Sequence, residues 1–231
     1  MTIGLVILGI VAVMLFFGAA EKYFDRLGLT SWLTFLMVLA LVIGAVMPEI
    51  KAGMLTITVG GFIVPLAVLA VVFALTFKKG SFFRPVISVL VVAMTTVAFR
   101  LIVGIGSSAQ VLACSLLTGF IGGTLAFPTA GSRLGTIAGA LGGCIIGDAV
   151  SAGLLRAFFG AENFVLGGYG IFDSIVISMA FGLLAYETVA FVRRKADDRR
   201  AASLALNTEA AEDVNLTSDE SEITEEEDDR R

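Results

Sequence analysis

Residues 134–155 read LGTIAGALGGCIIGDAVSAGLL, a run of 22 residues in which Asp148 is the one acidic or basic side chain. A helix rises about 1.5 Å per residue, so a run of this length spans the roughly 30 Å of hydrocarbon in a bilayer. Glycine recurs at every fourth position in and just before it, at Gly131, Gly135, Gly139, Gly143 and Gly147. Residues four apart share one face of a helix, so the stretch predicts a membrane-spanning helix with a groove for close helix packing.

We expect the partner in this packing to be the preceding apolar run, residues 109–127. That run carries three further glycines, Gly119, Gly122 and Gly123. Small residues on two facing helices let their backbones approach closely. The glycines therefore predict a structural interface and carry no chemistry of their own.

The composition of the whole chain is that of a membrane protein. Of its 231 residues, 57% are hydrophobic and 16% are charged, against about 25% charged residues in soluble domains. Apolar runs lie near residues 2–20, 31–48, 54–77, 86–106, 109–127, 134–155 and 171–192. We interpret the first run as a retained helix, since no Lys or Arg precedes it as in a signal peptide. The sequence predicts an all-α, polytopic transmembrane helix bundle of about seven spans.

Positive charges divide unevenly between the two predicted sides of the membrane. Lys and Arg are retained on the cytoplasmic side. With seven spans, one side has nine of them: Lys22, Arg26, Lys78, Lys79, Arg84, Arg133, Arg193, Arg194 and Lys195. The other side has two, Lys51 and Arg156. This asymmetry predicts an N-terminus outside and a C-terminus in the cytoplasm.

The segment after Lys195 differs from the rest of the chain. Residues 196–231 hold four basic and 13 acidic residues, whereas residues 1–195 hold 12 basic and seven acidic residues. Such a tail cannot bury enough apolar surface to offset its chain entropy. We predict a transmembrane domain over 1–195 and an acidic, disordered cytoplasmic tail over 196–231, with a weak helix near 198–206 as an alternative. The tail is either a solvated segment or a docking site for a cytoplasmic protein.

Several function classes are excluded because the chain has no histidine. Ser-His-Asp and Cys-His catalysis, histidine-ligated haem and nearly all zinc chemistry need that residue. Cys114 and Cys144 lie inside apolar runs, where we interpret them as small packing residues. We expect no metal, no cofactor and no nucleic-acid partner, and we favour a protein without enzymatic activity. The bilayer is the expected partner of the helices.

Three ionisable residues lie deep in predicted spans: Asp148, Asp173 and Arg100. A charge at that depth costs a few kcal/mol or more unless it is paired or faces water. Asp148 and Asp173 lie on neighbouring antiparallel helices toward the outer half of the membrane, where they could approach one another, and Arg100 could pair with either. We hypothesise that the three line the route of a small solute or ion. The alternatives are a structural carboxylate at Asp148, a first-turn acid at Asp173 and a snorkelling Arg100.

The third run concentrates features that interrupt a helix. Thr56, Thr58, Gly60, Gly61 and Pro65 fall within ten residues. In membranes, an interrupted helix is tolerated where it lines a cavity or is buried in protein. Gly60, Gly61 and Pro65 therefore predict a broken helix at a binding site, and a simple proline kink is the alternative.

Three segments together resemble a known family. They are TVGGFIVPL at 58–66, IGD at 146–148 and LGGYGIFDSI at 166–175. Over roughly residues 30–190 the chain resembles the prokaryotic multi-pass membrane proteins called domain of unknown function 1614. Asp148 directly follows Gly147, where the family spaces the two by one residue, so the resemblance extends less to Asp148 than to Asp173. It implies a multi-pass protein of a prokaryotic plasma (inner) membrane and supplies no activity.

Transport of a small solute or ion is the function that these features favour. A membrane scaffold, with the glycine-lined face and acidic tail binding other proteins, is the second hypothesis. The third is an intramembrane aspartyl protease, in which two carboxylates share a proton and activate water. Gly147-Asp148 and Gly170-x-x-Asp173 faintly resemble presenilin-type motifs, but the glycine spacing before Asp173 differs and a Pro-Ala-Leu element is missing.

Overall fold

The computed structural model describes residues 3–16, 31–78, 80, 83–104, 106–160 and 164–228. The predicted loop charges Lys22, Arg26 and Lys79 lie outside these residues. The chain divides into two units, Met1–Tyr186 and Glu187–Arg231. The candidate site residues all belong to the first unit.

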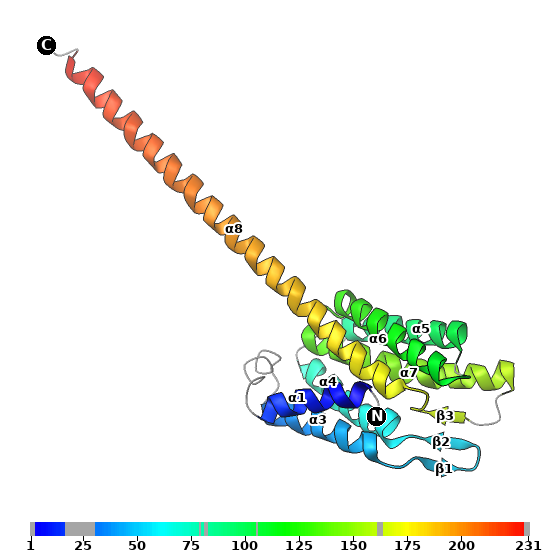
Figure 1. Cartoon of the computed structure of the whole chain (residues 1–231). Coiled ribbons are helices and arrows are strands. Elements are labelled where there is room, and N and C mark those ends of the chain that lie inside the picture. Colours follow the sequence, from blue (N-terminus) through cyan, green and yellow to red (C-terminus); the bar gives the residue numbers. More distant parts are fainter. Residues whose placement is uncertain are drawn as a thin grey trace. The chain divides into compact units, whose positions relative to one another are not determined.

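Helices dominate the first unit (Figure 1). The shorter apolar helices are α1 (Ile3–Phe16) and α3 (Ser31–Val46). The other helices are the π-helix η1 (Val59–Ile63), α4 (Val64–Lys78), α5 (Phe83–Val103), α6 (Ser108–Ala130), α7 (Arg133–Phe159) and α8 (Ile171–Asp228). Among the described residues, five helices are long and apolar enough to cross a membrane, with η1 and α4 counted as one. A helical fold suited to a membrane is thereby confirmed, while seven spans and their orientation stay predictions.

A small sheet is the exception to the all-α prediction, which is wrong at this point. Its strands are β1 (Ile50–Ala52), β2 (Leu55–Ile57) and β3 (Phe164–Leu166), in the order β1-β2-β3. β1 and β2 pair antiparallel, and β2 and β3 pair parallel. Apolar and β-branched side chains suit a half-buried strand, but they also extend an apolar run. For this reason the run predicted at 54–77 includes β2, which pairs with the neighbouring β1 and also with β3, over a hundred residues away.

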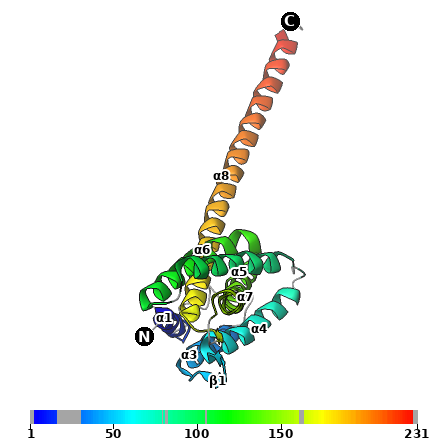
Figure 2. The ribbon, with the colours of Figure 1, turned by 90° about the vertical axis from the view of Figure 1, so that its right-hand side faces the viewer.

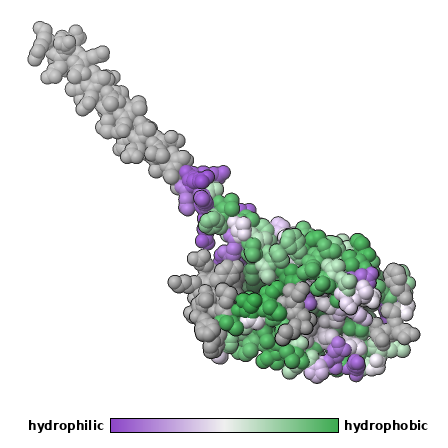
Figure 3. Space-filling model, viewed as in Figure 1, coloured by the Kyte–Doolittle hydropathy of each residue, from purple (hydrophilic) through white to green (hydrophobic). Residues whose placement is uncertain are grey.

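The central helix of the unit is α7, which contacts α4, α5, α6 and β3. Figure 2 shows α7 end-on among its neighbours. Its buried side chains are mostly small, including Ala138, Ala140 and Cys144. Large apolar side chains instead lie exposed on α5 and other outer helices, as Figure 3 shows for one face. A surface of this kind is suited to lipid.

The glycine stripe of α7 packs against α5. A side chain at Gly139, Gly143 or Gly147 would collide with residues of α5. These residues are themselves four positions apart: Ser88, Val92 and Thr96. The prediction that α6 packs against this stripe is therefore wrong. Two glycines of α6 pack against α8 instead, since Gly119 faces Ile177 and Gly123 faces Ser178, whereas Gly122 lies nearest to Val92 of α5.

Two of the five glycines assigned to the stripe lie at helix ends. Gly131 ends α6 with a φ of 68°, a left-handed conformation that glycine adopts without steric cost. Ser132 then caps α7, its hydroxyl accepting a hydrogen bond from the amide of Gly135. The resulting tight turn joins α6 and α7, so the four-residue repeat mixes packing positions with capping positions.

The second unit consists of the continuation of α8. Its backbone is helical through Asp228, and residues 229–231 lie outside the described residues. The predicted alternative, a helix near 198–206, lies within this helix. Disorder of the acidic tail in solution stays a prediction.

Candidate functional site

A buried ion pair joins α5 and α7. Nη1 of Arg100 lies 2.5 Å from Oδ1 of Asp148, and the two side chains are 3% and 0% exposed. The pair follows from the helix packing, because Thr96 sits against Gly147 and Arg100 lies one turn further along α5. Of the two partners that the sequence left open for Arg100, the structure selects Asp148. The alternative prediction, that Arg100 snorkels to the membrane interface, is wrong because its side chain is buried in protein.

The remaining polar atoms of this pair reach the segment Gly167–Gly170, which joins β3 to α8. Oδ2 of Asp148 accepts a hydrogen bond of 2.5 Å from the amide of Gly167. Nη2 of Arg100 donates to the carbonyl oxygens of Gly168 and Tyr169, at 3.3 and 3.4 Å. The pair therefore contacts one side of this segment through one acceptor and one donor group.

The segment Gly167–Gly170 has a backbone shape that most residues avoid. Its φ angles are 75° at Gly167, 48° at Tyr169 and 73° at Gly170. Glycine adopts such angles freely, whereas tyrosine does so at a steric cost that its surroundings must offset. Ser115 of α6 adds a hydrogen bond of 2.9 Å from its hydroxyl to the carbonyl of Gly170. Side chains of three helices thus fix the segment.

The interrupted helix packs against the same segment. Gly61 lies in η1 so close to the carbonyl of Gly167 that a Cβ atom would collide with it. A Cβ at Gly60 would lie 2.5 Å from the carbonyl oxygen of Gly44 in α3. Pro65 follows as the second residue of α4 and has no amide to donate to the preceding turn, which favours an irregular turn here. The structure places the predicted break at Val59–Ile63.

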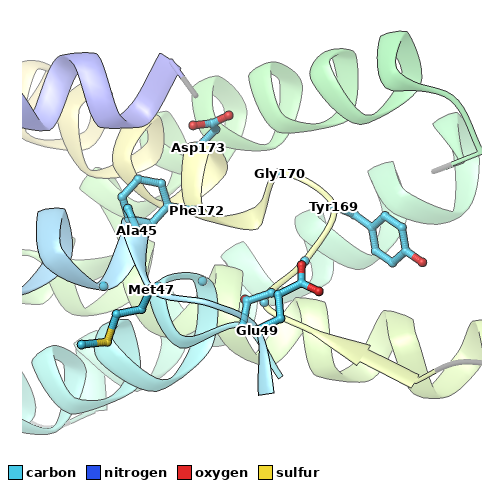
Figure 4. A pocket seen from close by; sticks show the side chains of 13 residues that line it. Ala45, Met47, Glu49, Tyr169, Gly170, Phe172 and Asp173 are labelled. Atoms are coloured by element: carbon cyan, nitrogen blue, oxygen red, sulfur yellow. The ribbon is translucent and has the colours of Figure 1, made fainter. Parts of the chain in front are cut away.

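A pocket of about 200 Å³ opens where these elements meet (Figure 4). Its wall combines backbone with a few side chains: Gly44, Ala45, Met47, Glu49, Thr58, Gly60, Gly61, Gly167, Gly168, Tyr169, Gly170, Phe172 and Asp173. Figure 4 shows the Glu49 carboxylate turned toward the segment at Gly170 and the Tyr169 ring pointing away from the other labelled residues. Among the described residues of the wall, Glu49 and Asp173 carry the charged side chains, and no lysine or arginine belongs to them. The charge that these residues bring to the pocket is therefore negative.

Asp173 also has a structural contact. It lies in the first turn of α8, is 8% exposed, and accepts a hydrogen bond of 2.7 Å from the amide of Gly4 in α1. The helix dipole and the unpaired backbone amides at the N-terminus of a helix stabilise a nearby carboxylate. The geometry therefore fits the interpretation of Asp173 as a first-turn acid. The same residue also forms part of the pocket wall.

The three predicted residues are thus divided between two places. Arg100 and Asp148 contact each other, whereas Asp173 lines the pocket and binds the amide of Gly4. Neither Arg100 nor Asp148 lines the pocket. Sequence reasoning missed Glu49, which lies between the runs predicted at 31–48 and 54–77, because β1 was interpreted as part of a loop and β2 as the start of a helix.

No cluster of three or more His, Cys, Asp or Glu residues suited to a metal occurs in the part of the chain that the structure describes. No family model, curated protein sequence or solved structure shows significant similarity to the chain.

Proposed function

We propose that this chain binds a small solute or ion in the pocket and carries it across a membrane. The observation that supports this best is the pocket itself, which lies at an interrupted helix and has the largely buried Asp173 in its wall. Membrane proteins use interrupted helices to offer backbone groups to a solute. They tolerate ionisable residues in their interior mainly where these serve such a route.

The family resemblance adds to the proposal. Two of the segments that resemble domain of unknown function 1614, 58–66 and 166–175, are separated by about a hundred residues and both contribute to the pocket wall. The resemblance implies a location in a prokaryotic plasma (inner) membrane. The nine-to-two division of positive charge predicts that the end carrying Lys51 and the pocket faces outside.

A membrane scaffold is the second candidate. It is favoured by the buried pair of Arg100 and Asp148, whose contacts are with other parts of the protein itself. In a scaffold, substitutions at Asp173 would alter stability or assembly and leave any flux unchanged. The acidic tail would then be the natural site for a cytoplasmic protein.

An aspartyl protease is the least favoured function. It requires two carboxyl groups that share a proton. The two oxygens of Asp148 are instead engaged by a guanidinium and a backbone amide, while Asp173 accepts a hydrogen bond from Gly4. This separation of partners argues against a catalytic pair.

The proposal is tested with purified protein in proteoliposomes. A pH-sensitive dye inside the vesicles reports proton flux, and currents on a solid-supported membrane report responses to Na⁺, K⁺, amino acids and sugars. We expect one of these solutes to give a signal with the parent protein that falls at least tenfold in Asp173→Asn. Asp197→Asn, which removes an exposed carboxylate further along α8, is the control. Signals that are equal in the parent and in Asp173→Asn would remove the transport proposal.

A further inference from the structure

We propose that Arg100 and Asp148 are positioning residues, which hold the segment Gly167–Gly170 as a wall of the pocket and do not themselves contact the solute. The inference deepens the proposed function, because it takes the pocket as the binding site. It differs from the expectation that the two residues line the route. The distinction is visible in the contacts, since both residues bind the backbone of the segment while neither lines the pocket.

The segment needs support because it has little regular hydrogen bonding of its own. It leaves β3 at Gly167 and enters α8 after Gly170, with left-handed backbone angles at three of its four residues. A free segment of this kind would populate many conformations, and the pocket wall would vary with it. Fixing it requires partners from outside, which α5 and α7 supply together with Ser115 of α6.

The polar groups that the segment presents explain why a pair of opposite charges is used. Gly167 presents an amide donor, whereas Gly168 and Tyr169 present carbonyl acceptors. A carboxylate alone can satisfy only the amide, and a guanidinium alone can satisfy only the carbonyls. Together they satisfy both kinds of group and compensate each other's charge, which makes the pair tolerable in a buried site.

The inference predicts that hydrogen bonding, and not charge, is what the segment requires. Two neutral double variants separate these properties: Arg100→Gln with Asp148→Asn, and Arg100→Leu with Asp148→Leu. Neither leaves an unpaired charge in the bundle. The first retains a donor and an acceptor near the segment, whereas the second retains neither.

Mobility of the segment is measured with a nitroxide spin label at Tyr169→Cys. Tyr169 is 42% exposed and its ring points away from the other labelled residues (Figure 4), so the label has room outside the pocket. The two native cysteines, Cys114 and Cys144, are buried and are replaced by alanine in all proteins. The purified full-length chain is compared in lipid nanodiscs by its electron paramagnetic resonance spectrum, and the same cysteine is tested for its rate of reaction with a polar maleimide.

We expect the Leu/Leu variant to give a mobile spectrum and at least a fivefold faster maleimide reaction, while the Gln/Asn variant stays within twofold of the parent. Ser151→Ala is the control, because Ser151 is buried on α7 and its hydroxyl donates to the backbone carbonyl of Asp148, within the same helix. It should leave both readouts unchanged. A Leu/Leu variant as ordered as the parent, or a Ser151→Ala variant as mobile as Leu/Leu, would overturn the inference.

If a double variant fails to fold, Arg100→Lys is used in the same two measurements. It keeps the charge opposite Asp148, but its single nitrogen replaces both Nη1, which contacts the carboxylate, and Nη2, which donates to the two carbonyls. We expect the ammonium to remain with the carboxylate and to leave the carbonyls, so the label should be mobile. A parent-like spectrum for Arg100→Lys would then overturn the inference. None of these measurements requires a solute, so failure of the flux experiment with Asp173→Asn leaves their outcome interpretable.

Discussion

Arg100 and Asp148 meet beside the point where Thr96 of α5 rests against Gly147 of α7, since Arg100 lies one helical turn beyond Thr96 and Asp148 directly follows Gly147. The absence of a side chain at Gly147 brings the two backbones together, and the close approach buries the ion pair that follows. Nη1 of Arg100 lies 2.5 Å from Oδ1 of Asp148, and neither side chain is more than 3% exposed. The glycine repeat, which has no chemistry of its own, thereby sets the position of the buried charges.

Removing one member of this pair should be more harmful than removing both. Arg100→Leu leaves the Asp148 carboxylate buried without its counter-ion, and Asp148→Leu does the same to the guanidinium. Breaking a buried pair in this way costs about 3–5 kcal/mol, whereas replacing both members by apolar residues is often close to neutral. We expect each single variant to lose monodisperse protein on heating in detergent well before the Leu/Leu double variant. Single variants as stable as the double variant would contradict this account of the pair.

Glycines on one helix should differ sharply in their tolerance of alanine. A Cβ at Gly143 would collide with Val92, so Gly143→Ala should destabilise the bundle by about 1–3 kcal/mol through overpacking. Gly153, also in α7, has no neighbouring atom within 4 Å of the added Cβ. Gly153→Ala should be neutral or stabilising, because alanine favours a helix by up to about 1 kcal/mol over glycine.

Thermal unfolding of the two glycine variants in the same detergent provides the measurement. Gly153→Ala should unfold at or above the temperature of the parent, and Gly143→Ala at a lower temperature. Equal loss in both variants would indicate that contact with α5 does not determine the effect.

Hydropathy alone locates the long helices but not their neighbours. The apolar runs predicted at 86–106, 109–127 and 134–155 correspond to α5, α6 and α7. Which helix fills the glycine groove depends on side chains that match it in register, and Ser88, Val92 and Thr96 of α5 do so although α5 has no glycine stripe. Small residues mark a face for packing, but they do not identify the helix that occupies it.

In the site, too, the sequence identifies the charged residues but not their partners. Charge in an apolar run suffices to select Arg100, Asp148 and Asp173 from the sequence. Their partners depend on long-range contacts, such as the hydrogen bond between Asp173 and Gly4, 169 residues apart. The place of Glu49 in the pocket depends on pairing of β2 with β3, which no local pattern reveals.

Gly61→Ala should disrupt the pocket more than its small volume suggests. The added Cβ would collide with the carbonyl oxygen of Gly167, and backbone cannot move aside as a flexible side chain does. We expect a loss of about 1–3 kcal/mol of stability and a mobile spin label at Tyr169→Cys. Gly9→Ala in α1, where the Cβ meets nothing within 4 Å, is the matched control. An ordered label in Gly61→Ala would show that the two backbones are not in contact.

The two roles of Asp173 can be separated by substitution. Asp173→Asn keeps an oxygen that can accept from the Gly4 amide, whereas Asp173→Ala removes it. Loss of a helix cap costs about 0.5–2 kcal/mol. Hydrogen exchange at the start of α1 should therefore be near that of the parent in Asp173→Asn and at least several-fold faster in Asp173→Ala. Exchange that is equally fast in both variants would mean that the negative charge, and not the hydrogen bond, holds α1.

The orientation of the chain determines which solution the pocket contacts. Lys51 lies in β1, at the pocket end, and Lys78 ends α4, whose first residue, Val64, follows η1 at the pocket. In a background without native cysteines, we expect Lys51→Cys to react with a membrane-impermeant maleimide in intact cells. Lys78→Cys should react only after permeabilisation, because α4 and η1 together are long enough to cross the hydrocarbon. Both side chains are exposed, so poor access within the protein does not explain a difference. The reverse labelling pattern would turn the pocket toward the cytoplasm, and equal labelling at both positions would argue that η1 and α4 do not span the membrane.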